Sequence, residues 1–416
     1  MNLLSNFDTE LNPARNPSSL WRKCLLLLGP GFITAATVLG PGSITVSSSA
    51  GALMEYSVLW VLVIAAVFMS AFTVIAGKIG CLNRHSLLFI VQQQYGRWLA
   101  ILIGLSVFLI TAGFQTGNNI GVGLAFDAAF GGGIALWAGV FLVIALVFIW
   151  TSSNFYKLLE KVMMLMVILM IIAFIGNLFR ISPDLGALAA GFFPSPPAIW
   201  GLVIAISATS FSIAGAAGQA YMVQGKGWQP QDLRKSNASA VAGIVVLCGL
   251  TLIIMITSAA VLAPQGIQVH SALDMAVQLE PLLGPLAKWL FLLGLFAASF
   301  SSFVANAVLG GMLLSDGFGW GRTLNDKSVK IFTSLLLAGS TLIAILAEAN
   351  PIQLIIMAQA STVLGAPLIA IVLLLLGNNK KVLGSRTNGW FTNVTAGLAS
   401  LWLLYLSVNQ LLTFLQ

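Results

Sequence analysis

The stretch GFITAATVLGPGSITVSSSAGALMEYSVLW, residues 31–60, decides the fold. At its centre, Gly40-Pro41-Gly42-Ser43 places two glycines and a proline within an otherwise apolar pattern typical of a helix. Proline lacks a backbone N–H donor and glycine weakens a helix, so the tetrapeptide predicts a break inside that helix. Such a break calls for a functional explanation if the helix crosses a membrane.

The composition predicts a polytopic membrane protein. Of the 416 residues, 58% are hydrophobic and 7% are charged, whereas a soluble domain carries roughly 25% charged residues. A polar segment precedes Leu25 and further apolar runs follow at once, so we expect a retained anchor and no cleaved signal peptide. The scattered Cys24, Cys81 and Cys248 have no metal or redox spacing. We therefore expect a bilayer as the surroundings, no cofactor and no nucleic-acid partner.

Eleven apolar runs are long enough to cross roughly 30 Å of hydrocarbon. Of the 19 lysines and arginines, only Arg180 and Lys288 fall in the predicted outer segments. This bias predicts a multi-pass protein of the cell (inner or plasma) membrane, with its N-terminus in the cytoplasm and its C-terminus outside. The predicted spans, numbered in order, are 25–48, 56–80, 98–126, 134–152, 160–179, 198–224, 238–262, 286–314, 328–347, 351–377 and 390–414.

The spans divide into two sets of five, and an odd number per set inverts the second relative to the first. Span 6 contains Ser212-Ile213-Ala214-Gly215-Ala216-Ala217-Gly218, a second weak stretch. Because the first helix of each set is interrupted, the pattern predicts an alternating-access transporter with its site where the breaks meet. Glycines that only permit close helix packing are the alternative. The predicted parts are a cytoplasmic tail 1–24, repeats 25–180 and 198–377, and an additional helix 390–414.

Three segments, in this order, resemble the NRAMP family of proton-coupled divalent-metal transporters. They are GPGFITAATVLGPGSITVSSSAGALMEYSVLW (29–60), ALDMAVQLEPLLGPLAKWLFLLGLFAASFSSFVANAVLGGMLLSDGF (272–318) and QASTVLGAPLIAIVLLLLGNNKKVLGSRTNGW (359–390). The resemblance covers nearly the whole chain. It implies an all-α membrane protein with eleven transmembrane helices, in a LeuT-like fold of two inverted five-helix repeats plus one extra helix.

The residues that carry function in that family differ here. The family's Asp-Pro-Gly-Asn corresponds to Gly40-Pro41-Gly42-Ser43, so both metal-ligating side chains are absent. Its Met-Pro-His motif falls on Ser212-Ile213-Ala214, and two acids tied to proton transfer correspond to Gln115 and Asn118. Of the implied ligands, only the glutamine of the tenth helix is kept, at Gln359.

Acidic side chains are expected to avoid the hydrocarbon. A buried charge costs ~2.5–3.5 kcal/mol on insertion scales, and divalent ions usually require carboxylates. We therefore expect that the transition-metal site and the proton relay are lost. The twelve acids, all predicted in loops or at span ends, are Asp8, Glu10, Glu55, Asp127, Glu160, Asp184, Asp232, Asp274, Glu280, Asp316, Asp326 and Glu348.

A neutral lining remains near the breaks. Interrupted helices expose backbone N–H and C=O groups, each end carrying roughly half an elementary charge, which suits a small solute with an anionic head, with a monovalent cation assisting. Interhelical bonding is the alternative for Gln115, Asn118 and above all Asn119, and Ser47, Ser48 and Ser49 are expected to bond their own preceding carbonyls. The predicted substrate site comprises Gly40, Pro41, Gly42, Ser43, Gln115, Asn118, Thr209, Ser210, Ser212, Ala214, Gly215 and Gln359, with Thr45 also in the lining.

Three functions stay open from the sequence. The first is a secondary transporter that has lost metal and proton coupling and carries a small polar or anionic organic solute. The second is a divalent-metal carrier, of the manganese or magnesium type, whose partly hydrated ion is held by backbone carbonyls, Ser43 and Gln359. The third is a non-transporting sensor, for which a long soluble domain is missing. No nucleophile–base set lies at membrane depth, so we do not expect an enzyme. A monomer is compatible with the sequence.

Overall fold

The computed structural model describes residues 38–151, 167–346 and 350–415, and every regular element in these ranges is a helix. Within them, nine helical segments are long and apolar enough to cross a membrane. Spans 1 and 5 of the predicted eleven are described only in part, as α3 (Pro41–Met54) and the helix Val167–Leu178. The all-helical membrane fold is confirmed, and the count of eleven is not. The predicted tail 1–24 lies outside the described residues.

Seven of the nine segments are built on a single long helix, and two are made of a pair of shorter ones. The long helices are α4 (Leu59–Leu82), α6 (Arg97–Phe130), α7 (Ile134–Thr151), α12 (Leu233–Val261), α15 (Leu286–Phe318), α16 (Lys327–Leu346) and α20 (Trp390–Leu415). The pairs are α10 (Trp200–Ser210) with α11 (Ile213–Gly225), and α17 (Pro351–Ser361) with α18 (Ala366–Asn378). The short connecting helices are α5 (Leu87–Tyr95), α9 (Leu185–Ala190), η2 (Pro230–Asp232), η3 (Ala263–Gln265), α13 (Ala272–Ala276), η4 (Val277–Leu279), α14 (Glu280–Leu283) and α19 (Lys380–Leu383).

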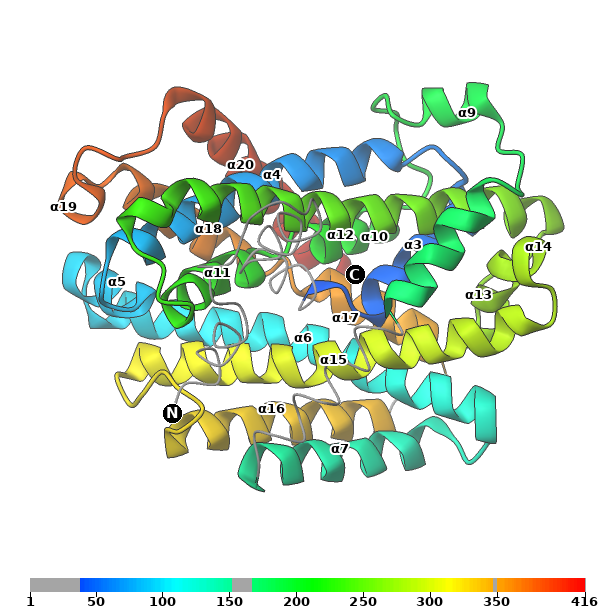
Figure 1. The fold of residues 1–416 in the computed structure, drawn as a ribbon, viewed down its shortest axis with the longest axis horizontal. Helices are drawn as coiled ribbons and strands as arrows, with labels where there is room; N and C mark the ends of the chain where they lie inside the picture. Colours follow the sequence, from blue (N-terminus) through cyan, green and yellow to red (C-terminus); the bar gives the residue numbers. More distant parts are fainter. Residues whose placement is uncertain (1–37, 152–166, 347–349, 416) are drawn as a thin grey trace, which may run out of the picture.

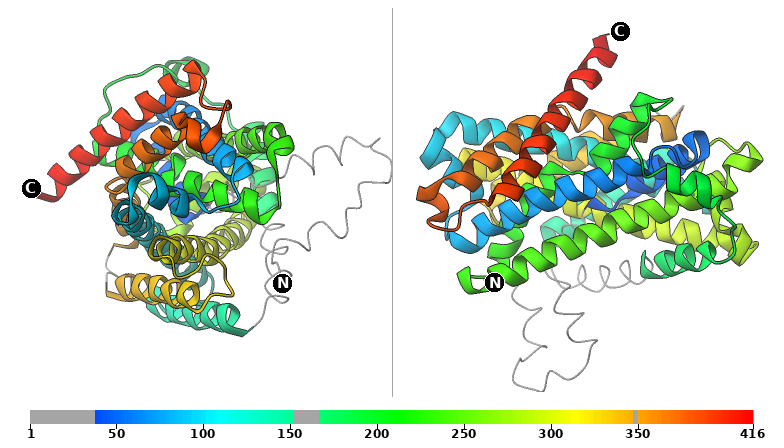
Figure 2. Two further views of the ribbon diagram at one scale, coloured as in Figure 1. Left: turned by 90° about the vertical axis from the view of Figure 1, so that its left-hand side faces the viewer. Right: turned by 90° about the horizontal axis from the view of Figure 1, so that it is seen from above.

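The broken helices occupy the centre of the bundle. In Figure 1, α3, α10, α11 and α17 lie between α12 on one side and α6 with α15 on the other. The α10–α11 segment is 94% buried along its most apolar window, whereas α7 and α20 are 22% buried along theirs. Helix α20 also diverges from the bundle toward the C-terminus (Figure 2). The weakest helix formers in the sequence are therefore held by packing from all sides.

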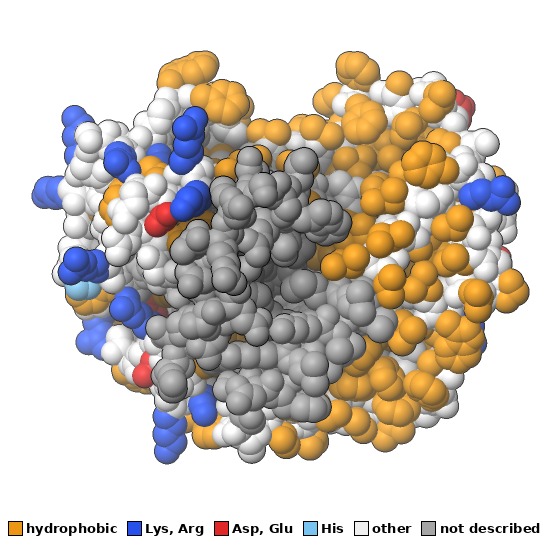
Figure 3. Space-filling view, viewed as in Figure 1, with side chains coloured by type: hydrophobic (Ala, Val, Ile, Leu, Met, Phe, Trp, Pro, Cys, Tyr) orange, Lys and Arg blue, Asp and Glu red, His pale blue; other side chains and the backbone are white. Residues whose placement is uncertain are grey.

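Basic side chains gather at one end of the bundle. The α4–α5, α11–α12, α15–α16 and α18–α20 connections share that end (Figure 1), and most of the Lys and Arg side chains in Figure 3 lie there, while hydrophobic side chains cover much of the remainder. We call it the basic end. The opposite end holds α9, α13 and α14. This separation matches the charge bias in the sequence, and its assignment to the cytoplasm stays a prediction.

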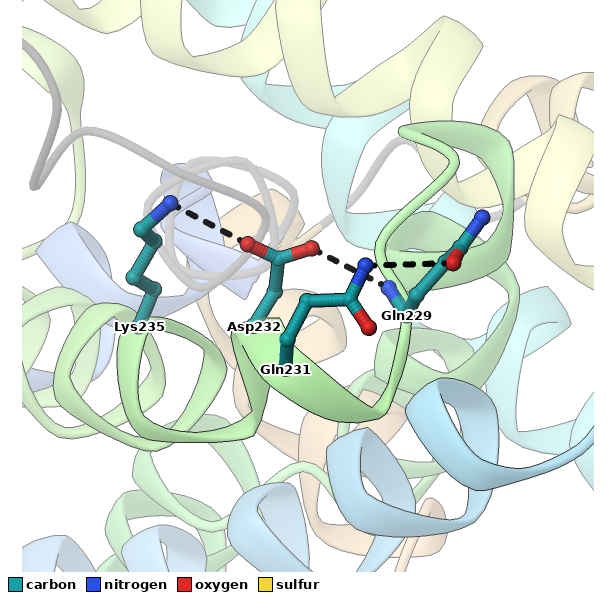
Figure 4. Close-up of polar contacts among 4 residues, drawn as sticks. All are labelled: Gln229, Gln231, Asp232 and Lys235. Carbon is teal, nitrogen blue, oxygen red and sulfur yellow. Dashed lines mark hydrogen bonds and ion pairs between the residues drawn. The ribbon is translucent and has the colours of Figure 1, made fainter.

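The start of α12 at the basic end shows how its polar groups are paired (Figure 4). Asp232 accepts hydrogen bonds from the backbone N–H of Gln229 at 3.2 Å and from Lys235 Nζ at 3.1 Å, and Gln231 Nε2 donates to Gln229 Oε1 at 3.1 Å. The contact of Lys235 with Asp232 is the one ion pair among the described residues. Exposed pairs of this kind contribute little to stability, so burial of apolar surface holds the bundle together.

Candidate functional site

Both predicted helix breaks are present. Residue 38 is helical, Leu39 and Gly40 are not, and α3 begins at Pro41, where a missing N–H costs nothing because the first turn has no partner for it. The second break comprises Phe211 and Ser212, between α10 and α11. Ser212 Oγ accepts a hydrogen bond from the Gly215 N–H at 3.2 Å and so caps α11.

The two breaks adjoin each other. A Cβ atom added at Gly215, at the start of α11, would lie 2.7 Å from Val38 Cγ2, just before the first break. A Cβ added at Gly40 would lie 2.8 Å from Asn118 Oδ1 of α6. The residues predicted around the two breaks are thus brought together on α3, α6 and α11. A small recess of about 10 Å³ borders the second break and is lined mainly by apolar side chains, among them Phe114 and Phe211.

The side chain of Gln359 occupies a slot made by two glycines. A Cβ at Gly42 would lie 2.5 Å from Gln359 Nε2, and a Cβ at Gly117 would lie 2.5 Å from the same atom. Side chains larger than glycine at either position would displace the amide. Gly42 of α3 and Gly117 of α6 therefore leave room for the Gln359 side chain of α17. We call this slot the Gln359 seat.

Several buried polar atoms on α3, α6, α10 and α17, the helices that carry the seat and border the breaks, have no hydrogen-bond partner. Most buried polar groups in proteins are paired, since leaving one unpaired costs about 1–3 kcal/mol. An unpaired buried atom beside the helix breaks is therefore a candidate ligand for a bound substrate. These atoms are Ser43 Oγ, Thr45 Oγ1, Ser47 Oγ, Gln115 Nε2, Ser210 Oγ and Gln359 Oε1.

Other predicted lining residues have structural bonds. Thr209 Oγ1 donates to the Ile206 carbonyl within α10, and Pro41 packs where a Cβ of Gly121 would lie. Asn119 Nδ2 donates to Ser340 Oγ at 3.1 Å and Thr341 Oγ1 at 2.7 Å. The interhelical interpretation of Asn119 is thus confirmed.

That interpretation does not hold for the neighbouring amides. Asn118 Nδ2 lies 3.5 Å from Gln115 Oε1 on its own helix, α6. The prediction that Ser47, Ser48 and Ser49 bond their own preceding carbonyls was also wrong. The hydroxyl groups of Ser47 and Ser49 have no hydrogen-bond partner, while Ser48 Oγ accepts from Gln278 Nε2 at 2.8 Å. Of the three serine hydroxyls, only that of Ser48 bonds a neighbouring element.

One acidic residue is placed differently from the sequence prediction. Helix α15 continues to Phe318, past the predicted end of span 8, and buries Asp316 with 9% of its surface exposed. Its carboxylate accepts hydrogen bonds from Tyr221 Oη at 2.6 Å and Ser86 Oγ at 3.0 Å. Described residues contain no group of three His, Cys, Asp or Glu side chains able to hold a metal. Asp8, Glu10, Glu160 and Glu348 lie outside the described residues.

Comparisons with known proteins agree with this architecture. The chain is 25% identical to the divalent metal cation transporter MntH of Yersinia pestis, over 98% of each chain. Its structure is similar to that of the Eremococcus coleocola manganese transporter, with a TM-score of 0.75 at 17% identity, over 95% of this chain and 87% of that one. The structure of MhsT in complex with L-phenylalanine gives a TM-score of 0.59 at 18% identity, over 91% of this chain and 98% of that one.

The family comparison covers most of the sequence. Residues 31–413 match the profile of the natural resistance-associated macrophage protein-like family, Nramp. This range includes both helix breaks and the Gln359 seat. The chain therefore belongs to the Nramp family of membrane transporters.

Proposed function

We propose that this Nramp protein carries a divalent metal cation by alternating access, and that neutral oxygen atoms at the junction of the two breaks hold the ion. The names of its relatives, a divalent metal cation transporter and a manganese transporter, support a metal substrate. They do not support the organic-solute interpretation. We further propose that the basic end faces the cytoplasm, with the N-terminus inside and the C-terminus outside.

The Gln359 seat is the observation that carries the proposal. Its amide is fixed between Gly42 and Gly117, and its Oε1 atom is buried without a partner. Ser43 Oγ, one residue after Gly42, is also buried and unpaired. Amide, hydroxyl and backbone oxygens are suitable ligands for Mg²⁺ and Mn²⁺. Carbonyl groups at the C-terminal end of α10 add negative partial charge.

Ion chemistry sets the form of the bound cation. A neutral site cannot replace the whole hydration shell of a divalent ion, since no formal negative charge offsets the desolvation. Mg²⁺ in particular keeps several waters when it binds proteins. The proposal therefore places a partly hydrated ion at the seat, held by Gln359, Ser43 and carbonyl oxygens.

An organic-solute carrier is the second candidate function. The observation that favours it is the neutral lining together with the uncapped start of α3, where the N-cap residue is Gly40 and no side chain bonds the free N–H groups. Free N–H groups at a helix start attract anions. A small solute with a carboxylate would use these groups in place of the Gln359 oxygen.

Uptake into proteoliposomes separates the two. We expect saturable uptake of radioactive Mn²⁺ that Mg²⁺ inhibits, and at least a tenfold rise in the apparent KM for Gln359→Ala and Ser43→Ala. Gln265→Ala is the matched control, because the Gln265 side chain bonds only the Val261 carbonyl, near the end of the bundle opposite the basic end. Absence of Mn²⁺ uptake and of calorimetric binding, with saturable uptake of amino acids or organic acids that Gln359→Ala leaves unchanged, would instead establish the second function.

A further inference from the structure

A buried aspartate, Asp316, connects three elements at the basic end through hydrogen bonds. Asp316, near the end of α15, accepts hydrogen bonds from Tyr221 of α11 and from Ser86, which also caps α5 through the Phe89 N–H. Tyr221 Oη accepts in turn from the Leu88 N–H at 3.4 Å. We call Asp316, Tyr221 and Ser86 the inner latch.

A second set of bonds ties α11 to the same place. Gln224 Nε2 donates to the carbonyl groups of Asn83 at 2.9 Å and His85 at 2.7 Å, both in the α4–α5 turn. Helix α11 has 13 residues and so spans about 20 Å at 1.5 Å per residue. Its first turn borders the second break, and its last turns carry the latch. A movement at the latch is therefore transmitted directly to the site.

We propose that Asp316 is a proton-binding residue of the inner latch: ionised, it holds α11 against α15 and α5, and protonated, it releases α11. An ionised carboxylate accepts from both hydroxyls, and such charge-assisted bonds are roughly twice as strong as neutral ones. Protonation makes one carboxyl oxygen a donor and removes the charge. One proton is taken from the solvent at the basic end, and no other covalent bond forms or breaks.

The groups that face Asp316 are few. Tyr221 contributes the one titratable side chain of α11 in the latch, and Arg322, in the α15–α16 turn, acts on the carboxylate electrostatically. Arg97, at the start of α6, lies nearby and donates to the Phe318 carbonyl at 3.5 Å. His85 lies in the α4–α5 turn with its ring stacked on Phe89. Asp316 is thus a buried acid bound by hydroxyls and influenced by Arg322, and its ionisation decides the strength of the latch.

The opposite end is closed by neutral groups. Gln278 Nε2 donates to Ser48 Oγ at 2.8 Å, Ser258 Oγ donates to the Ser48 carbonyl at 2.5 Å, and Asn177 Nδ2 donates to the Gln278 carbonyl at 2.6 Å. These bonds tie α3 to α12 and η4. None of these side chains titrates near neutral pH, so the bonds that tie α3 to α12 and η4 do not respond to protonation as the inner latch does.

Cysteine accessibility tests the latch without transport. In a chain with Cys24, Cys81 and Cys248 replaced by alanine, Ala214→Cys places a thiol at the start of α11, where the native residue is 1% exposed. The labelling rate by a membrane-impermeant maleimide, applied from the basic end, is measured at pH 6 and pH 8. Each rate is normalised to that of the unfolded protein at the same pH, because thiol reactivity itself depends on pH.

We expect labelling to be several-fold faster at pH 6 than at pH 8. In Asp316→Asn the labelling rate should be high at both pH values. At pH 8 it should exceed the parental rate roughly tenfold, equivalent to about 1.4 kcal/mol. Tyr221→Phe should label faster at pH 8 and keep a pH response. Asp232→Asn is the matched control: Asp232 also lies at the basic end, and its side chain bonds only Gln229 and Lys235.

Parental labelling rates in Asp316→Asn, or an unchanged pH step in that variant, would overturn the proposal. Should Asp316→Asn fail to fold, parental rates in both Tyr221→Phe and Ser86→Ala would overturn it equally. The proposal rests on the alternating-access part of the proposed function. Labelling needs no substrate, so a pH-gated thiol in a protein without Mn²⁺ uptake would refute the metal carrier and leave the latch standing.

Discussion

Replacing Gly42 with alanine would place one methyl group in the Gln359 seat. Its carbon would lie 2.5 Å from Gln359 Nε2 and 2.9 Å from Cγ, closer than real Cβ atoms approach. The obstructed atoms belong to the far end of a flexible side chain, so the amide moves and the backbone stays in place. We therefore expect Gly42→Ala to fold and to lose substrate affinity.

The size of the loss follows from one displaced ligand. A hydrogen bond or equivalent contact to a charged group contributes about 1.5–3 kcal/mol, which corresponds to a roughly 10- to 150-fold weaker apparent affinity. Alanine is favoured over glycine in helices by about 1 kcal/mol, and this gain offsets part of the steric cost in the folded protein. The thermal unfolding temperature should change little while the apparent KM for Mn²⁺ rises.

Matched variants make the test specific. Gly117→Ala approaches the same amide from α6 and should give a similar loss, whereas Gly249→Ala in α12 has nothing within 4 Å and should transport normally. The double variant Gly42→Ala with Gln359→Ala should be no worse than Gln359→Ala alone, since residues that share one contact are not additive. A parental KM in Gly42→Ala, or additive losses in the double variant, would refute the reasoning.

Three further outcomes follow from the packing and the charges. Gly51→Ala should lower the thermal unfolding temperature by several degrees in detergent, because the new Cβ meets the Met255 carbonyl and lies 2.6 Å from Ser258 Cβ on α12, where rigid helices cannot yield. Asn119→Ala should cost about 0.6–1.7 kcal/mol of stability through its bonds to α16 and leave the KM unchanged; a change in KM would contradict its structural role. Partial burial acts to raise the pKa of Asp326, but the Thr323 and Arg322 hydrogen bonds outweigh it and hold that pKa below its usual value. The stabilisation from the ionised Asp326 is present above its unfolded pKa of about 3.9 and is lost as pH falls through its lower folded pKa. The stability difference between Asp326→Asn and the parent should therefore be seen at pH 7 and shrink as pH falls below the unfolded pKa.

The helix breaks could be predicted because their cause is local. The tetrapeptide Gly40-Pro41-Gly42-Ser43 weakens a helix through its own backbone, and the structure breaks the helix at Leu39 and Gly40. The second break, at Phe211 and Ser212, likewise falls at the edge of the small-residue stretch. Local backbone chemistry is sufficient at the first break. At the second, Ser212 alone of the predicted stretch lies in the break, while Gly215 and Gly218 are helical within α11, so the sequence predicts the region and not the interrupted residues.

The inner latch and the Gln359 seat depend on distant partners. Asp316 looks like a span end because the apolar run stops at 314, yet Tyr221 and Ser86 bind it from 95 and 230 positions away. Gly42 and Gly117 line one slot only because α3 and α6 lie on either side of α17. Hydropathy measures the chain one residue at a time and carries no information about such pairs.

The chemistry of the lining sets what kind of metal this site can prefer. Sulfur and imidazole ligands select soft and borderline transition metals, while amide, hydroxyl and carbonyl oxygens suit Mg²⁺ and Mn²⁺. The predicted polar lining residues supply oxygen and amide nitrogen only, and Ser212 and Ala214 stand at positions where the family resemblance implies sulfur and imidazole. A cation held this way keeps water in its shell, and discrimination between ions then depends on hydrated size and on the room left by Gly42 and Gly117. Mg²⁺ should therefore inhibit Mn²⁺ uptake to the same extent as a softer ion such as Cd²⁺, because no ligand at the seat binds soft ions preferentially.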